Sequence, residues 1–158
     1  MKLFLKSLVF TLCVPGVVGG CVPWFAVRSR DAATGWPFTF GLALLGFGAA
    51  VYLWCAFDFA LFGRGTPAPI DAPKRLVVRG LYRFSRNPMY VGVTAAIVGW
   101  SLLYSARPVL IYGACVAAGF QLWVKFYEEP HLTRVFGAEY SEYCARVGRW
   151  LTLPGRLR

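Results

Sequence analysis

Four long apolar stretches constrain the fold of this chain more than any other feature of its sequence. A helix needs about 20 apolar residues to cross the hydrocarbon core of a bilayer, so every stretch except the third is long enough to span one. The whole 158-residue chain is 58% hydrophobic, well above a typical soluble domain. The sequence therefore predicts an all-α integral membrane protein of about four transmembrane helices, folded as a single membrane domain over residues 1–158. The stretches run from Ser7 to Val27, Pro37 to Phe62, Met89 to Tyr104 and Pro108 to Tyr127.

Short-range signals indicate how some of these helices pack. Only a brief turn at Ala106, marked by Arg107-Pro108, separates the last two stretches, so we expect them to form a helical hairpin. The second stretch carries three glycines, Gly41, Gly46 and Gly48. Small residues on a membrane helix allow close packing, either within one chain or between two.

The basic residues predict an orientation, because Lys and Arg accumulate on the cytoplasmic side of short loops. With the N-terminus inside, Arg28, Arg30 and Arg107 lie outside and the rest of the 17 Lys and Arg residues lie inside. Both termini are therefore expected in the cytoplasm.

The net charge of +10 could indicate a nucleic-acid partner. The chain has no basic recognition helix, however, and orientation and anionic headgroups account for the charge, so none is expected.

The first stretch has a second interpretation. Lys2 and Lys6, followed by an apolar run that ends at Val18-Gly19-Gly20-Cys21, resemble a lipoprotein signal with Cys21 as its acceptor. The apolar run continues past Cys21 to Val27, which favours a full span.

The chain's 5 cysteines are scattered singly without metal-ligand spacing, so neither a metal site nor a disulfide is expected.

The run from Arg79 to Gly92 is dense in basic, aromatic and turn-forming residues between two apolar stretches. It follows a Gly- and Pro-rich connector at residues 63–69 and a short run at residues 74–80 that we expect to be extended. Asn87 is placed to cap a helix that begins at Pro88. The first N–H groups of that helix and Arg86 would then face an anionic group together. This predicts a polar pocket at the mouth of a helix bundle.

An acidic pair, Glu128-Glu129, stands at the expected cytoplasmic end of the last apolar helix. Two adjacent carboxylates near the negative end of a helix dipole need a compensating cation or ligand. A purely structural ion pair is the alternative to a binding role. The candidate cations are Arg83, Arg86, Lys125 and Arg134.

Beyond the acidic pair, Pro130 is expected to break the helix. From His131 onward, apolar residues recur at three- and four-residue spacing opposite a charged face, which predicts a C-terminal amphipathic helix in the membrane interface, able to close over a pocket. Its apolar residues are Leu132, Phe136, Tyr140, Tyr143 and Val147.

No span carries a midplane charge apart from Asp58, which argues against a transporter. Asp58 is expected to reach the interface or to pair with an arginine of the following loop.

Residues 63–154 resemble the isoprenylcysteine carboxyl methyltransferase and phospholipid methyltransferase superfamily of membrane enzymes. One departure stands out, because the family usually has His where this chain has Asn87. An Asn side chain hydrogen-bonds but does not take up a proton, so it cannot act as a base. The residues that carry the resemblance are Gly80-Leu81-Tyr82-Arg83, Arg86-Asn87-Pro88-Met89-Tyr90-Val91-Gly92, Glu128-Glu129, Leu132, Phe136-Gly137, Tyr140, Tyr143, Arg149-Trp150 and Pro154.

The resemblance implies a site for S-adenosylmethionine at the cytoplasmic ends of the last two spans, with no metal. Arg86 and the N–H groups near Pro88 would suit its carboxylate, the acidic pair its ammonium or ribose, and Tyr82 or Tyr90 its adenine or sulfonium. Glu128 and Arg134 would lie nearest the acceptor and act as the catalytic residues, brought together by a bend at Pro130. The cofactor-binding residues implied are Tyr82, Arg86, Asn87, Pro88, Met89, Tyr90, Gly92, Glu128 and Glu129.

The acceptor implied by this resemblance is lipophilic and arrives from the bilayer. A carboxylate acceptor is already nucleophilic and would need only Arg134 to orient it. A lipid amine must lose a proton, and Glu128 is the evident base. The alternative to an enzyme is a non-catalytic lipid-binding or assembly protein that retains the fold, because fold alone does not imply activity.

Overall fold

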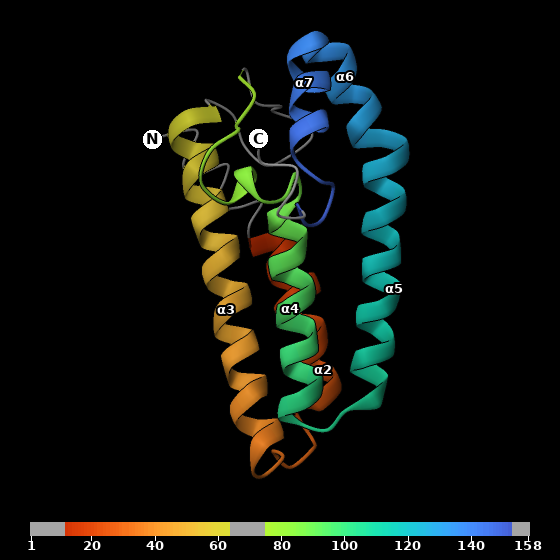
Figure 1. Ribbon diagram of the computed structural model, residues 1–158. Coiled ribbons are helices and arrows are strands. Elements are labelled where there is room, and N and C mark those ends of the chain that lie inside the picture. The colour runs from red at the N-terminus through yellow and green to blue at the C-terminus, as the bar shows by residue number, and fades with distance from the viewer. Residues whose placement is uncertain (1–11, 64–74, 153–158) are drawn as a thin grey trace.

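The structure, a computed structural model, describes residues 12–63 and 75–152 of the chain (Figure 1). In these two ranges the chain is helical and contains no strand, which confirms the all-α prediction. Lys2, Lys6, Lys74, Pro154 and most of the expected connector at residues 63–69 lie outside the described residues. The helices are α2 (Val22–Val27), α3 (Trp36–Asp58), α4 (Pro88–Leu103), α5 (Arg107–Trp123), α6 (Glu129–Phe136) and α7 (Ala138–Arg146).

Three stretches extend these helices with wider turns, and one short helix precedes α4. A π-helical segment, Leu12–Cys21, leads directly into α2, and π-helical turns at Phe59–Gly63 and Val124–Glu128 follow α3 and α5. A single 3-10 turn, Gly80–Arg83, lies between α3 and α4. Residues 76–78 before it form no helix or strand, Arg79 has an extended backbone, and Val77 is buried in a cluster with Cys55 and Tyr82.

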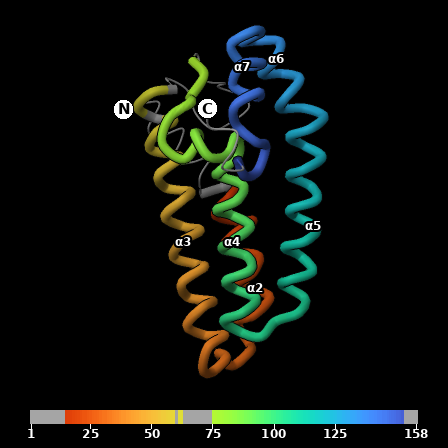
Figure 2. Tube along the Cα trace, viewed as in Figure 1, coloured from red at the N-terminus to blue at the C-terminus, as the bar shows by residue number. Residues whose placement is uncertain are grey.

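The long helices α3, α4 and α5 lie side by side as one bundle, with α2 packed against α4 (Figure 1, Figure 2). The core of the bundle forms around α4, where Val93 and Ile97 pack with Val27 of α2 and Val109 of α5. Helices α6 and α7 gather at one end of the bundle, beside the start of α4 (Figure 1). That end is where the acidic pair and the Arg79 to Gly92 run come together.

Among the described residues, two helices are long and apolar enough to cross a membrane: α3, and the continuous helix Arg107–Phe136 that joins α5 to α6. Less than a third of each apolar window is buried inside the protein, 28% and 17%. The segment Pro15–Val27 and α4 are apolar but shorter. Each of the four expected spans therefore coincides with an apolar helix, and two of them have full spanning length.

Glycines bring α3 and α4 into backbone contact. A Cβ atom on Gly41 would lie 2.7 Å from the backbone N of Leu103, and one on Gly92 would lie 2.8 Å from the carbonyl O of Gly48. Real Cβ atoms do not approach other atoms that closely, so only glycine fits at these positions. Gly46 faces open space, with nothing within 4 Å of a built Cβ. The small-residue pattern thus acts within one chain at Gly41 and Gly48.

The turn between α4 and α5 agrees with the expected hairpin. It is closed by a hydrogen bond from the Ala106 N–H to the Ser101 carbonyl O at 2.8 Å, and the Ser101 hydroxyl donates to the Ala106 carbonyl O at 3.1 Å. Ser105 takes the left-handed conformation there, with φ of 46°. The glycines of α4 approach the backbone of α3, whereas Gly113 of α5 meets α4 only at the Ile97 side chain, 3.0 Å from a built Cβ.

Pro130 does not break the helix, contrary to the sequence prediction. The chain remains helical from Arg107 to Phe136. The π-helical turn before Pro130 already shifts the hydrogen-bond ladder, since the Glu129 N–H donates to the carbonyl O of Val124, five residues back. A wider turn of this kind accommodates a proline that an ordinary α-helical turn would reject. The acidic pair is therefore inside a helix and not at its negative end.

The break falls at Gly137 instead. Gly137 has φ of 54°, a conformation that favours glycine, and it ends α6 and starts α7. The expected single amphipathic helix is thus two short helices. Its apolar stripe is nevertheless intact, because Tyr140, Tyr143 and Val147 are buried together and Leu132 and Phe136 pack against them.

The close contacts of Gly41 and Gly48 on α3 with α4, and of Gly92 on α4 with α3, are called the glycine seam. This seam makes a testable prediction about stability. Gly48→Ala should lower the free energy of unfolding by about 1–3 kcal/mol, because the added methyl group overpacks the contact with α4. Gly46→Ala is the matched control: it should leave stability unchanged or raise it by up to about 1 kcal/mol through helix propensity. Unfolding in detergent, followed by circular dichroism, measures both variants. Equal stability of the two variants would contradict the inferred close contact between Gly48 and α4.

Candidate functional site

A cavity of about 610 Å³ opens where α4, α5, α6 and α7 meet the segment before α4. Polar side chains occupy one part of its wall, and aromatic and aliphatic side chains form the rest. The aromatic and aliphatic side chains extend the cavity along α4 and α5 as far as Val18 and Tyr112. The polar residues are Arg86, Asn87, Glu128, Glu129 and His131, with the hydroxyls of Tyr82, Tyr90, Tyr140 and Tyr143.

Glu129 lies between two guanidinium groups. Arg149 bonds it with both nitrogens of its fork, from Nε to Oε1 at 2.8 Å and from Nη2 to Oε2 at 2.7 Å. Arg86 adds an ion pair, with Nη1 3.0 Å from Oε1. The Glu129 side chain is only 18% exposed, so these contacts are shielded from water. The hydrogen bonds to Glu129 raise the pKa of the Arg149 guanidinium, which is thus firmly charged.

Arg86 is itself largely enclosed. Its Nη1 also donates to the Tyr140 hydroxyl at 3.3 Å and contacts the sulfur of Cys144. Its Nε is buried and has no hydrogen-bond partner in the structure. A buried donor without a partner is uncommon in a folded protein and indicates a missing acceptor. Arg86 therefore lines the cavity while its Nε is enclosed without an acceptor.

Glu128 has a different partner from Glu129. The Tyr90 hydroxyl donates to its Oε2 at 3.0 Å, across from α4 to the π-helical turn after α5. No Lys or Arg among the described residues pairs with it, in contrast to Glu129. The two adjacent carboxylates thus have different environments. Glu129 is held by two cations, and Glu128 has one neutral donor and lines the cavity.

Asn87 precedes α4 but does not cap it with its side chain, contrary to expectation. Its side-chain NH₂ group donates to the carbonyl O of Arg149 at 3.0 Å, and its side-chain oxygen accepts no hydrogen bond from the first turn of the helix. The backbone N–H of Asn87 instead donates to the Ser85 hydroxyl at 3.0 Å. Asn87 therefore anchors the segment that carries Arg149, and its burial leaves 6% of the residue exposed.

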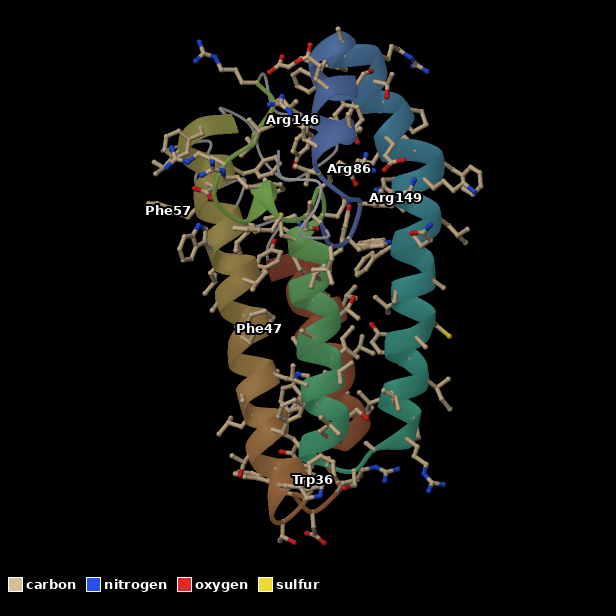
Figure 3. The ribbon with its side chains drawn as sticks, viewed as in Figure 1. Trp36, Phe47, Phe57, Arg86, Arg146 and Arg149 are labelled. Carbon is tan, nitrogen blue, oxygen red and sulfur yellow. The ribbon has the colours of Figure 1, made fainter. Side chains whose placement is uncertain are left out.

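The segment after α7 returns across the start of α4 and is tied down at several points. The Arg86 N–H donates to the carbonyl O of Gly148 at 3.0 Å, and the Thr152 N–H donates to that of Phe84 at 2.8 Å. The Trp150 indole N–H reaches the side chain of Gln121 on α5 at 2.8 Å. These bonds place Arg149 close to Arg86 and behind Glu129, which line the cavity (Figure 3).

Helix α7 also binds the 3-10 turn directly. The Tyr143 hydroxyl donates to the carbonyl O of Tyr82 at 2.7 Å. Burial raises the pKa of the Tyr143 hydroxyl well above its ordinary value, so the hydroxyl keeps its proton and remains a donor. Both rings line the cavity.

The structure brings together seven of the ten site residues expected from the sequence. Pro88 starts α4 and Gly92 packs against α3 at the glycine seam, so neither lines the cavity. Arg134 is exposed on α6 and does not approach Glu128, because the helix is not bent at Pro130. Its role beside the acceptor stays a prediction. The seven are Tyr82, Arg86, Asn87, Met89, Tyr90, Glu128 and Glu129.

Arg149 is the residue that sequence reasoning missed as a partner of the acidic pair. The expected cations for the pair were Arg83, Arg86, Lys125 and Arg134, and of these only Arg86 makes the contact. The available signal was the conspicuous Arg149-Trp150 dipeptide after the amphipathic stripe. Its meaning depends on the chain's return across α4, which no local pattern reveals.

Comparisons with known proteins agree with this arrangement. Residues 36–139, more than half of the chain, match the phospholipid methyltransferase family. No curated protein and no solved structure matches the chain. The matched range includes α3, α4 and α5 together with Arg86, Tyr90 and the acidic pair. The members of this family are methyltransferases that use S-adenosylmethionine as methyl donor. The chain belongs to the phospholipid methyltransferase family.

Proposed function

We propose that this protein transfers a methyl group from S-adenosylmethionine to a phospholipid-type acceptor inside the cavity at the α6 and α7 end of the bundle. One observation carries the proposal. A single cavity joins a charged wall that contains Arg86 and Glu128 to an apolar wall formed by α4 and α5. A charged, water-soluble donor and a lipophilic acceptor would need those two surroundings side by side.

The charged wall fits the methyl donor. Arg86 lines this wall, and its guanidinium would donate charge-assisted hydrogen bonds to the carboxylate of an amino-acid moiety. The N–H groups in the first turn of α4, at Met89 and Tyr90, point to the same place by helix geometry. The volume of about 610 Å³ lies within the roughly 300–1,000 Å³ typical of small-molecule sites. Glu129 would hold Arg86 in position, and Tyr82 and Tyr90 offer rings for the adenine or the sulfonium.

The donor, when bound, supplies a methyl group activated by a positively charged sulfur. The chain's own task is then to align the acceptor with that methyl group and to exclude water. Apolar side chains such as Val93, Val116 and Phe120 line the approach to Glu128 and would hold a lipid chain. No covalent intermediate with the protein is required.

Glu128 is proposed as the base. A phospholipid amine must lose a proton to become nucleophilic, and Glu128 is an acidic side chain in the cavity without a cationic partner. The Tyr90 hydroxyl holds its carboxylate by one oxygen and leaves the other free to accept a proton. Asn87 cannot take this role, because it carries no titratable group and is bonded to Arg149.

The site is proposed to lie at a membrane surface. Aromatic and aliphatic side chains such as Phe47, Leu53 and Phe57 are more than half exposed on α3, which would be unfavourable in water. A core helix of a soluble protein would instead be mostly buried, whereas 28% of the apolar window of α3 is. We propose a multi-pass membrane protein with the cavity end, and both termini, on the cytoplasmic side.

Arg86→Gln should weaken binding of S-adenosylmethionine by about 10- to 100-fold, because a charge-assisted hydrogen bond is lost. Arg146→Gln is the matched control, since Arg146 is exposed and pairs only with Glu142 on the same helix. Isothermal titration calorimetry on protein in nanodiscs measures both. If the parent protein, shown to be folded, does not bind at millimolar ligand, the methyltransferase proposal fails and the non-catalytic alternative takes its place.

Glu128→Gln should lower the rate of methyl transfer to phosphatidylethanolamine vesicles by about 10²- to 10⁴-fold, the usual contribution of a general base. Transfer of a labelled methyl group into extracted lipid gives the rate. Glu142→Gln, an exposed acid on α7, is the control and should retain activity. A carboxylate acceptor would give a different result, because its methylation needs no base and would survive the Glu128 substitution.

The orientation is testable with an impermeant thiol reagent on intact cells. A cysteine placed by Ala32→Cys, in the loop between α2 and α3, should react from outside. One placed by Ala138→Cys, at the start of α7, should react only after the membrane is opened. The parent chain with its own cysteines gives the background. Labelling of Ala138→Cys in intact cells would reverse the proposed orientation.

A further inference from the structure

The cavity has a closed end far from its charged wall. At that end it is lined by Val18, in the π-helical segment Leu12–Cys21, and by Tyr112 of α5. The Tyr112 hydroxyl donates to the carbonyl O of Val18 at 3.0 Å, so the two walls are joined across the end. The proposed methyl transfer gives neither residue a part.

The sequence accounts for this bond. In a π-helical ladder the Val18 carbonyl would accept from the N–H five residues further on, but that residue is Pro23, which has none. A carbonyl without a donor is unfavourable in apolar surroundings. The Tyr112 hydroxyl supplies a donor, and its ring is thereby held across the cavity.

Helix α5 packs tightly on α4 at this end of the cavity. Gly113 is buried, and a Cβ atom built there would lie 3.0 Å from Cγ2 of Ile97. Ile97 and Val109 belong to the bundle core and do not line the cavity. Closer to the charged wall, Gly119 lines the cavity and has nothing within 4 Å of a built Cβ. The cavity is thus a channel with room at Gly119 and an end at Tyr112.

This channel is longer than one leaflet of a bilayer. The helix Arg107–Phe136 rises about 24 Å between Tyr112 and Glu128. Half of the hydrocarbon core of a bilayer is about 15 Å. An acceptor bound at Glu128 would therefore lay an extended apolar chain along α5 until the end of the chain meets Tyr112.

We propose that Tyr112 sets the maximum length of the acceptor's apolar chain and is a specificity-determining residue for methyl transfer. The inference rests on the proposed function, since it takes the chain to belong to the methyl acceptor. Each added methylene gains apolar contact until the channel is full. A longer chain must displace the Tyr112 ring and break its bond to Val18. The charged wall lies at the other end, so this selection is separate from donor binding.

Native mass spectrometry of the detergent-purified protein tests the proposal with lysophosphatidylethanolamines of graded length, from lauroyl to behenoyl. Each probe has a single chain, so chain length is the only variable. The parent should retain the probes up to a limiting length and lose the longer ones. Tyr112→Ala should retain the first probe beyond that limit about tenfold better than the parent does, because the channel is extended. Comparison with the parent at each length cancels differences in micelle partitioning.

Gly119→Leu tests the channel between its two ends, and it serves should Tyr112→Ala not fold. The new side chain enters open space, so the fold is undisturbed, and it should reduce retention of the long-chain probes by about tenfold. Ala118→Leu is the matched control, because Ala118 is exposed on the same helix and does not line the cavity. It should retain every probe as the parent does.

The two proposals fail in different ways, because retention of a lipid does not depend on methyl transfer. If Tyr112→Ala and Gly119→Leu retain every probe as the parent does, the length limit is overturned, whatever the rate of transfer. If both variants change retention as expected but the parent transfers no methyl group to any probe, the length-selective channel stands and the methyl-transfer proposal fails.

Discussion

The bidentate bond between Arg149 and Glu129 is the interaction on which the site depends. It joins the end of the described chain to the helix that runs from α5 into α6, and through Glu129 it fixes Arg86 at the start of α4. Three segments distant in sequence thus meet at one carboxylate. Removing Glu129 would leave two guanidinium groups close together and partly buried, which costs far more than the loss of one surface ion pair. The geometry of the charged wall follows from this contact.

The two neighbouring glutamates show how position on a helix assigns different roles to identical side chains. Adjacent helical residues point about 100° apart, so Glu128 and Glu129 face different neighbours. Glu129 forms ion pairs with Arg86 and Arg149 and holds both guanidinium groups in place. Glu128 meets one tyrosine hydroxyl and keeps its capacity to accept a proton. The π-helical turn at Val124–Glu128 sets this register, because one extra residue in the turn rotates everything beyond it.

Local signals in the sequence identified most of the helices, and non-local contacts account for what they missed. Pro88 and Arg107-Pro108 mark helix starts that the structure reproduces, since proline fits the first turn of a helix and little else. The glycines of α3 indicated close packing but not the partner, which is α4. Pro130 does not end the helix, because the π-helical turn before it has already shifted the backbone hydrogen bonds. Asn87 and Arg149 take their roles from a chain return that no periodicity encodes.

The short length of α4 explains why charged chemistry sits at the mouth of an apolar bundle. With 16 residues, α4 spans about 24 Å, less than the roughly 30 Å of a hydrocarbon core. Its first turn is therefore recessed below the ends of α3 and of the helix Arg107–Phe136. The depression is lined by Tyr140 and Tyr143 of α7 and by apolar side chains of α4 and α5. In the proposed function, a lipid headgroup and a water-soluble donor would meet there without either one crossing the membrane.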